Sequence, residues 1–209
     1  MKKYTALALC GSLRAESLNF ALLHAIKRVA SPELEVAIGD RITEVPVYNQ
    51  DHDDSVPGAV AAVPPRSVEL LRSELARADA IILASPEYNA SISGPVQNLL
   101  NWASRPLLGK PVLVVVATPN ASTGVAALAA TSEALRIMGA VVIEPGLIIN
   151  GADHVISGRG PDAVLEEGLA GMASSQLSLL EAYLRLDVAG IQGRVVQDMR
   201  TRRRALGAR

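Results

Sequence analysis

Several residues after the first apolar run suit the binding of an anion. Ser12, Arg14, Ser17 and Asn19 lie within the ten residues 11–20. Arginine grips phosphate with two parallel hydrogen bonds, and hydroxyl groups supply further donors. If a helix begins at Ser17, its free N–H groups and dipole favour an anion as well. This pattern predicts a phosphate cradle. The alternative is that Ser17 is only a helix cap and Arg14 a solvated surface side chain.

Other phosphate-binding and nucleophile motifs do not fit this segment. A Walker loop needs a Gly-Lys-Ser/Thr triplet, and none follows Gly11. A phosphatase-type loop with Cys10 as nucleophile needs an arginine six residues on, where the chain has Glu16. We therefore expect Cys10 to be a small buried hydrophobe at a strand end. Residues 158–163 (GRGPDA) match the dinucleotide pattern formally, but no strand precedes them. We interpret them as a loop followed by a helix start.

Metal and disulfide chemistry have little support in the sequence. His24, His52 and His154 are far apart and share no ligand spacing. The acidic stretch 51–54 (DHDD) has carboxylates that suit magnesium or calcium, but it lacks the spacing of a calcium loop. We expect solvated loop charge there and no metal site. The single cysteine excludes an internal disulfide and a cysteine-based zinc site, which favours a reducing cytoplasm.

Apolar runs alternate with helical patterns, and this alternation must position the polar segments. Strands are predicted at 4–10, 34–38, 80–84, 112–117 and 141–149, with a break at residues 145 and 146. Helices are predicted at 17–30, 67–78, 94–104, 124–138 and 162–186, with a long turn-rich connection over 41–66. Five strand–helix units predict an α/β fold. We expect a flavodoxin-like, doubly wound, five-stranded parallel sheet of order 2-1-3-4-5, with helices on both faces.

Composition limits the class of protein. The chain has 209 residues, 49% of them hydrophobic, which suits one domain with a large core, expected at 1–190. No uncharged run is long enough to cross a bilayer. The net charge of −1 gives no global reason to expect a nucleic-acid partner. Residues 191–209 form a basic C-terminal extension, which we interpret as solvated. Its arginines are Arg194, Arg200, Arg202, Arg203, Arg204 and Arg209.

The segment 86–105, together with 11–19, resembles the NAD(P)H-dependent FMN reductase family, which includes chromate, quinone and azo-dye reductases. The typical pattern after the third strand is PEYN-x-S-x-PG-x-LKN-x-x-DW-x-SR. The chain keeps Pro86, Glu87, Tyr88, Asn89, Ser91, Gly94, Asn98, Trp102, Ser104 and Arg105. It departs from the pattern at Ser93, Pro95, Gln97 and Asn101, and the loop 118–124 lacks the usual double glycine. The similarity covers about residues 4–143.

The resemblance implies FMN as cofactor and NAD(P)H as electron donor. The acceptor would be a small molecule: a quinone, an azo compound, chromate or free flavin. The loop after the first strand would hold the phosphate, and residues 86–89 would lie along the isoalloxazine ring. Homodimers or homotetramers are typical of the family. The residues expected at the cofactor are Ser12, Arg14, Ser17, Asn19, Phe20, Pro86, Glu87, Tyr88, Asn89, Ser91, Asn120 and Ser122.

No side chain is assigned a catalytic role, because the cofactor carries the chemistry. Tyr88 is expected near the flavin, whereas Trp102 is expected to be a helix–sheet or subunit-contact residue. Two other functions stay open on the sequence. One is an FMN-binding electron carrier or sensor without turnover. The other is a flavin-free adaptor that keeps the fold.

Overall fold

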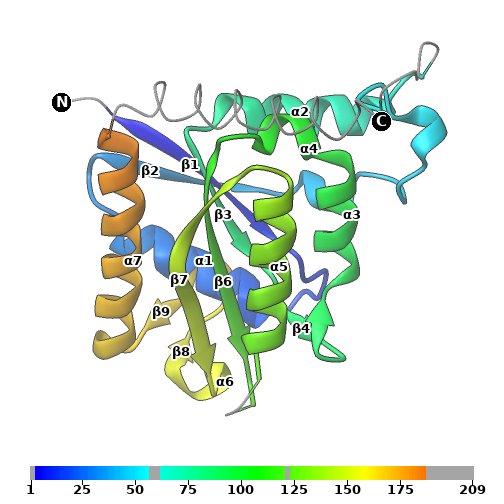
Figure 1. Cartoon of the computed structure of the whole chain (residues 1–209). Helices are drawn as coiled ribbons and strands as arrows, with labels where there is room; N and C mark the ends of the chain where they lie inside the picture. Colours follow the sequence, from blue (N-terminus) through cyan, green and yellow to red (C-terminus); the bar gives the residue numbers. More distant parts are fainter. Residues whose placement is uncertain (1–2, 57–61, 121–122, 187–209) are drawn as a thin grey trace.

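Five parallel strands form the centre of the computed structural model, which describes residues 3–56, 62–120 and 123–186 (Figure 1). The strands are β1 (Tyr4–Cys10), β2 (Leu34–Gly39), β3 (Ala80–Ala84), β6 (Pro111–Thr118) and β7 (Val141–Asn150). Their order is β2-β1-β3-β6-β7, which confirms the predicted flavodoxin-like order 2-1-3-4-5. The basic extension predicted at 191–209 lies outside the described residues.

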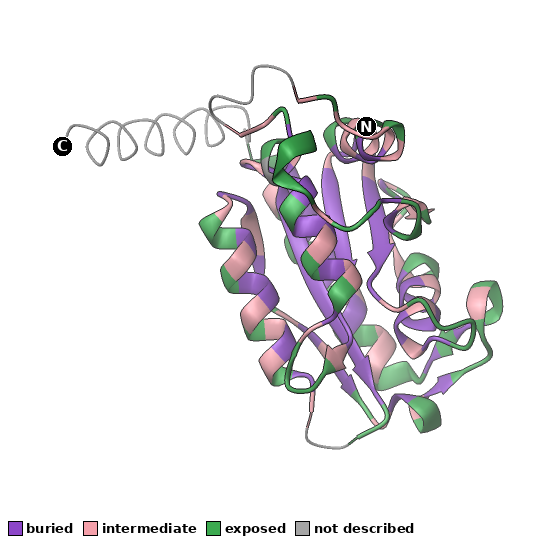
Figure 2. Cartoon of the chain, turned by 90° about the vertical axis from the view of Figure 1, so that its right-hand side faces the viewer, coloured by how far each residue is buried: buried purple, intermediate pink, exposed green. Residues whose placement is uncertain are grey.

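Helices cover both faces of this sheet, as the alternation of its side chains requires. In β1, Ala6 and Ala8 pack in one core and Leu7 and Leu9 in the other. Figure 2 shows the buried strands between the two helical layers. The first core is closed by α1 (Leu18–Val29) and α7 (Glu167–Arg185). The second is closed by α2 (Arg66–Arg77), α3 (Gly94–Trp102), α4 (Ser104–Leu107) and α5 (Val125–Ile137).

The last helix begins five residues later than predicted. Residues 156–165 form a small hairpin instead, in which β8 (Ile156–Ser157) pairs with β9 (Val164–Leu165). A 3-10 turn at Gly160–Asp162 lies between the two strands, and α6 (Ala152–Val155) precedes them. Gly158 has a φ of +74°, and a Cβ there would stand 2.4 Å from the carbonyl oxygen of Asp162. This tight turn excludes the helix that the sequence pattern favoured from 162.

A second hairpin, absent from the sequence prediction, follows β3. It consists of β4 (Glu87–Tyr88) and β5 (Ser91–Ile92). Asn89 and Ala90 connect the two strands, both with a φ of 53°. Two successive positive φ values suit the tight two-residue turn of a β-hairpin. The predicted connection 41–66 also contains structure, namely 3-10 turns at Arg41–Thr43 and Gln50–His52, before α2 begins.

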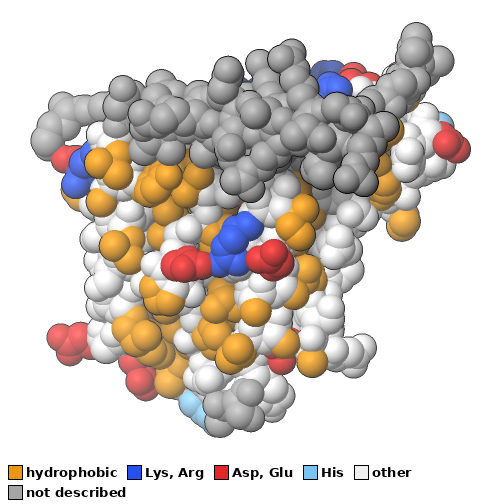
Figure 3. Space-filling model, viewed as in Figure 1, with side chains coloured by type: hydrophobic (Ala, Val, Ile, Leu, Met, Phe, Trp, Pro, Cys, Tyr) orange, Lys and Arg blue, Asp and Glu red, His pale blue; other side chains and the backbone are white. Residues whose placement is uncertain are grey.

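The outer side of α5 is largely apolar. Val125 and Ile137, at its two ends, are 65% and 71% exposed. Figure 3 shows this face, where hydrophobic side chains surround one charged cluster. In that cluster Arg136 pairs with both Glu133 and Glu144. An ion pair between Arg136 and Glu144 therefore holds α5 to β7, in addition to the packing of the buried side chains of the helix.

Gly11 allows the chain after β1 to lie against β3 and α3. Its N–H donates to the carbonyl oxygen of Ala84 at 2.8 Å, and its own carbonyl accepts from Ser93 Oγ at 2.9 Å. A Cβ at this position would stand 2.2 Å from Val96 Cγ2, well inside van der Waals contact. The close approach fixes where the first polar loop leaves the sheet.

We predict that Gly11→Ala lowers the free energy of unfolding by about 1–3 kcal/mol, the usual cost of overpacking. The control is Gly171→Ala, an exposed position of α7 where a Cβ meets nothing within 4 Å. That change should raise stability by up to about 1 kcal/mol through helix propensity. Urea denaturation of both variants measures the difference. Equal midpoints for Gly11→Ala and the wild type would contradict the packing argument.

Candidate functional site

The loops after β1, β3 and β6 meet at one edge of the sheet and enclose a small cavity of about 70 Å³. In open parallel sheets, ligands bind outside the carboxyl ends of the strands. Seven of the residues predicted at the cofactor line this cavity: Ser12, Arg14, Ser17, Asn19, Pro86, Glu87 and Tyr88. The volume suits a phosphate group and is well below the size of pockets that enclose a whole ligand.

The N-terminus of α1 opens into this cavity. Ser17 caps the helix, because its Oγ accepts a hydrogen bond from the N–H of Phe20 at 3.2 Å. A hydroxyl that accepts one bond still carries a proton that it can donate to an anion. The first turn of α1 contains no acidic residue. The helix dipole is therefore not neutralised there by a carboxylate from α1 itself.

Arg14 is exposed beside this helix end. Within the described part of the chain, its guanidinium has no hydrogen bond and no ion pair. The nearby Glu16 does not compensate it, since that carboxylate lies 3.6 Å from Arg159. The cavity thus combines an uncompensated cation with a helix N-terminus, and both favour an anion.

Asn19 has both ends of its side-chain amide bound to the backbone. Nδ2 donates to the carbonyl oxygen of Ala117 at 2.8 Å, and Oδ1 accepts from the N–H of the same residue at 2.9 Å. The side chain is buried, and it joins the first turn of α1 to the end of β6. Asn19 therefore positions α1 against β6 at the wall of the cavity, whereas the sequence suggested a direct phosphate contact.

Glu87 belongs to β4, and its side chain reaches the start of α5. Its Oε2 accepts from the N–H of Ala127 at 3.0 Å. This hydrogen bond lowers the pKa of the carboxyl, outweighing the opposing effect of burial, and the N–H groups of Gly124 and Ala126 lower it further. Gly124 has a φ of +102°, a left-handed conformation that lets the helix begin there. The N-terminus of α5 is thus filled by a carboxylate of the protein itself.

Tyr88 connects the hairpin to the first loop. Its hydroxyl lies 3.3 Å from Ser12 Oγ, and its side chain is 47% exposed at the rim of the cavity. Pro86, just before the hairpin, is buried.

The remaining predicted cofactor residues do not line the cavity. Asn89 and Ser91 are exposed on the hairpin, and the ring of Phe20 packs edge-on against His24. Asn120 is exposed, and its N–H donates to Thr118 Oγ1 at 3.2 Å. Ser122 lies outside the described residues.

The expectation of solvated charge at 51–54 was wrong for Asp53. This carboxylate is 2% exposed and pairs with Arg72 at 2.7 Å. Burial alone would raise its pKa, but hydrogen bonds from Ser55, Arg72 and Tyr48 outweigh burial and lower the pKa. No spacing in the sequence connects Asp53 with Arg72, which lies 19 residues away on α2.

Trp102 and Asn98, both on α3, bind the loop that leads to Asp53. The indole Nε1 of Trp102 donates to the carbonyl oxygen of Pro46 at 3.0 Å. Asn98 donates to that oxygen at 2.9 Å and accepts from the N–H of Tyr48 at 2.8 Å. These two residues of the motif 86–105 therefore position a loop, and neither lines the small cavity between the loops after β1, β3 and β6.

No group of three or more metal-ligating side chains occurs within 3–56, 62–120 and 123–186. In that same part of the chain, no helix has the length and apolar character needed to span a bilayer.

Comparison with known proteins identifies the family. The sequence profile described as NADPH-dependent FMN reductase matches residues 4–154. The chain belongs to this family. A quinone reductase of Pseudomonas putida is 31% identical over 163 residues, covering 75% of this chain and 83% of the relative. An NAD(P)H-dependent FMN reductase of Pseudomonas aeruginosa is 28% identical over 184 residues, covering 86% and 94%.

A solved structure extends this family relationship to the fold. The flavoenzyme NAD(P)H:(acceptor) oxidoreductase FerB from Paracoccus denitrificans superposes with a TM-score of 0.67 at 27% identity. The match covers 86% of this chain and 98% of FerB.

We predict that the contribution of Glu87 to stability depends on pH. Because its folded-state pKa is lowered, the contribution is fully present above the ordinary pKa of glutamate. It is lost as the pH falls through the lower folded-state value. Glu87→Gln should cost about 0.3–1 kcal/mol at pH 7, because glutamine accepts the hydrogen bond without the charge.

Urea denaturation of wild type and Glu87→Gln between pH 7 and pH 3 measures this difference. The control is Glu35→Gln on β2, whose exposed carboxylate pairs with Lys3 and lies at no helix N-terminus. A cost of Glu87→Gln that stays constant over this pH range would contradict the electrostatic assignment.

Proposed function

We propose that this chain binds FMN through its phosphate in the cradle of Ser12, Arg14 and Ser17, and acts as an NAD(P)H-dependent reductase. The observation that carries the proposal is the uncompensated Arg14 beside the acid-free N-terminus of α1. Family membership supports the same cofactor and donor. Both the donor set and the cavity size fit a phosphate monoester.

Different residues of the chain contribute to cofactor binding in different ways. Arg14 and the N–H groups of α1 stabilise the charge of the phosphate, and Ser12 and Ser17 supply hydroxyl donors. Asn19 fixes the helix relative to β6. Tyr88 lies at the rim of the cavity, where the larger part of the cofactor would leave it, and Asn89 and Ser91 are exposed on the same hairpin.

Bound FMN supplies the transfer of two electrons from NAD(P)H to a second substrate. We propose a quinone as that acceptor, in line with the quinone reductase from Pseudomonas putida. NAD(P)H gives up two electrons and one proton. The quinone takes up the two electrons and two protons and becomes a hydroquinone, with the second proton coming from water.

Assembly and location are further parts of the proposal. We propose a homodimer or homotetramer, as is typical of the family, and a cytoplasmic location, in line with the single cysteine. An electron carrier without turnover would be distinguished by steady-state kinetics. A reductase oxidises many equivalents of NADPH when a quinone is present, whereas a carrier oxidises about one.

We predict that Arg14→Ala weakens FMN binding about 10- to 100-fold, because a charge-assisted contact contributes roughly 1.5–3 kcal/mol. Titration of the apoprotein with FMN, followed by the visible spectrum or flavin fluorescence, measures the dissociation constant. Arg77→Ala is the control, because Arg77 lies at the far end of α2 and contacts Ser73. Wild-type affinity in Arg14→Ala would contradict the cradle.

A further inference from the structure

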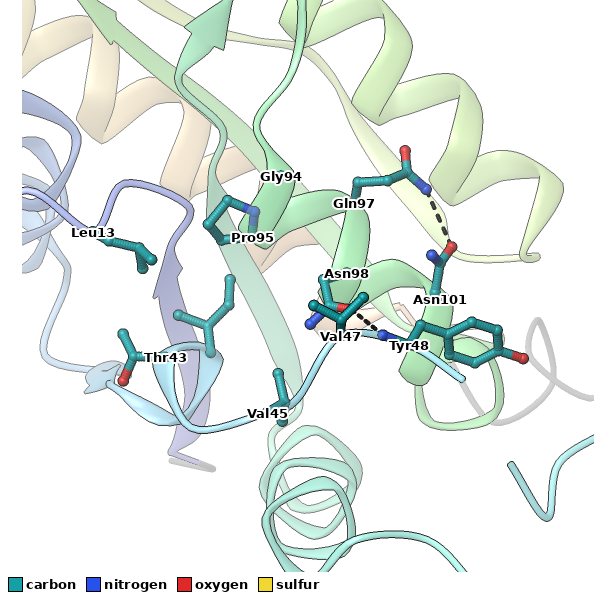
Figure 4. Close-up of a pocket in the computed structure, with 11 residues that line it drawn as sticks. Leu13, Thr43, Val45, Val47, Tyr48, Gly94, Pro95, Gln97, Asn98 and Asn101 are labelled. Atoms are coloured by element: carbon teal, nitrogen blue, oxygen red, sulfur yellow. Dashed lines mark hydrogen bonds between the residues drawn. The ribbon is translucent and has the colours of Figure 1, made fainter. Parts of the chain in front are cut away.

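A second, larger cavity lies next to the cradle. It has a volume of about 510 Å³, within the range of small-molecule pockets. Figure 4 shows it as a groove, with Leu13 and Pro95 on one side and Val47 and Asn98 on the other. Its lining comes from the first loop, the segment 42–48 and one side of α3. We call this cavity the α3 groove.

One short segment borders both cavities. Residues 12–14 belong to neither a helix nor a strand, and their side chains alternate between the two sites. Ser12 and Arg14 line the cradle, while Leu13 lines the α3 groove. A ligand that reaches the rim of the cradle near Ser12 is therefore also close to the entrance of the groove.

The chemistry of the α3 groove contrasts with that of the cradle. None of the described residues that line it is charged. Ile42 and Val45 are buried and form part of its wall, whereas Leu13 and Val47 are 62% and 86% exposed. An anion in the groove would lose hydration without meeting a cation, which is unfavourable. An apolar group would instead cover surface that is now in water.

The wall of the groove is held in place before any ligand arrives. Asn98 fixes Pro46 and Tyr48 by the two hydrogen bonds described above, and the ring of Tyr48 packs edge-on against Trp102. Gln97 Nε2 donates to Asn101 Oδ1 at 3.2 Å along the upper wall. Little conformational entropy is then lost on binding, because the surrounding chain is already ordered.

We propose that the α3 groove binds the apolar substituent of the electron acceptor. It selects neutral ring acceptors that carry an alkyl or prenyl chain over anionic acceptors such as chromate or free FMN. The amide groups of Gln97 and Asn101 suit the carbonyl oxygens of such a ring. This inference rests on the proposed reductase function, and it makes Leu13 and Val47 determinants of acceptor specificity.

The test is a series of 1,4-benzoquinones with no substituent, methyl, propyl or pentyl, reduced by the FMN-loaded enzyme with NADPH. Each buried methylene should raise kcat/KM about three- to fourfold until the groove is filled. Val47→Ser should reduce the ratio of pentyl- to unsubstituted-quinone kcat/KM at least fivefold. Ile137→Ser is the matched control, because it removes an exposed apolar side chain from α5, away from the groove.

A kcat/KM that does not depend on chain length in the wild type would overturn the inference and leave the reductase function standing. An FMN-loaded enzyme that turns over no quinone would overturn the proposed function itself. Chromate is a control acceptor. An equal loss of kcat/KM for chromate and for pentylquinone in Val47→Ser would indicate general damage and overturn the specificity role.

The native mass of the variants tests for a second copy of the chain in the groove. If Val47→Ser alters the mass, Ile137→Ser does not, and the quinone ratio is unchanged, the groove is a subunit contact. That outcome would overturn the inference. An unaltered mass together with a reduced ratio supports it.

Discussion

The amide of Asn19 satisfies both backbone groups of Ala117 where β6 approaches the end of the sheet. Backbone groups that leave a buried sheet need partners, and here a side chain 98 residues away supplies them. Glu87 does the same for the first turn of α5, and the Ser12–Tyr88 contact joins the hairpin to the first loop. Each of these contacts joins two segments that are far apart in the amino-acid sequence. The shape of the cradle depends on all three.

The strands and their order could be predicted because their causes are local. Apolar runs such as 80–84 and 112–117 are buried on both faces, and the crossover rule leaves few arrangements of parallel strands. Ser17 could be identified as a helix cap for the same reason, because a cap depends only on the N–H groups of the two or three residues that follow it. The predicted cradle rests on the same kind of local signal.

The roles of Asn19, Glu87 and Asp53 could not be predicted, because each depends on a partner distant in the chain. The sequence does not reveal whether the carboxylate of Glu87 faces a ligand or a helix terminus. The hairpin 87–92 was missed because its turn places Ala90 at a positive φ, a conformation that alanine rarely adopts. The late start of α7 depends on a tight turn at Gly158 that helical periodicity does not reveal.

Two helix N-termini lie at the edge of the sheet, and they differ in whether a carboxylate of the protein binds them. That of α5 is occupied by Glu87, and that of α1 has no acid in its first turn. The protein carries its own competing anion at one terminus, so an incoming phosphate meets attraction at α1 and a fixed negative charge at α5. In the proposed binding mode, this difference in charge would orient a cofactor that has one charged end and one flat aromatic end before its ring makes any contact.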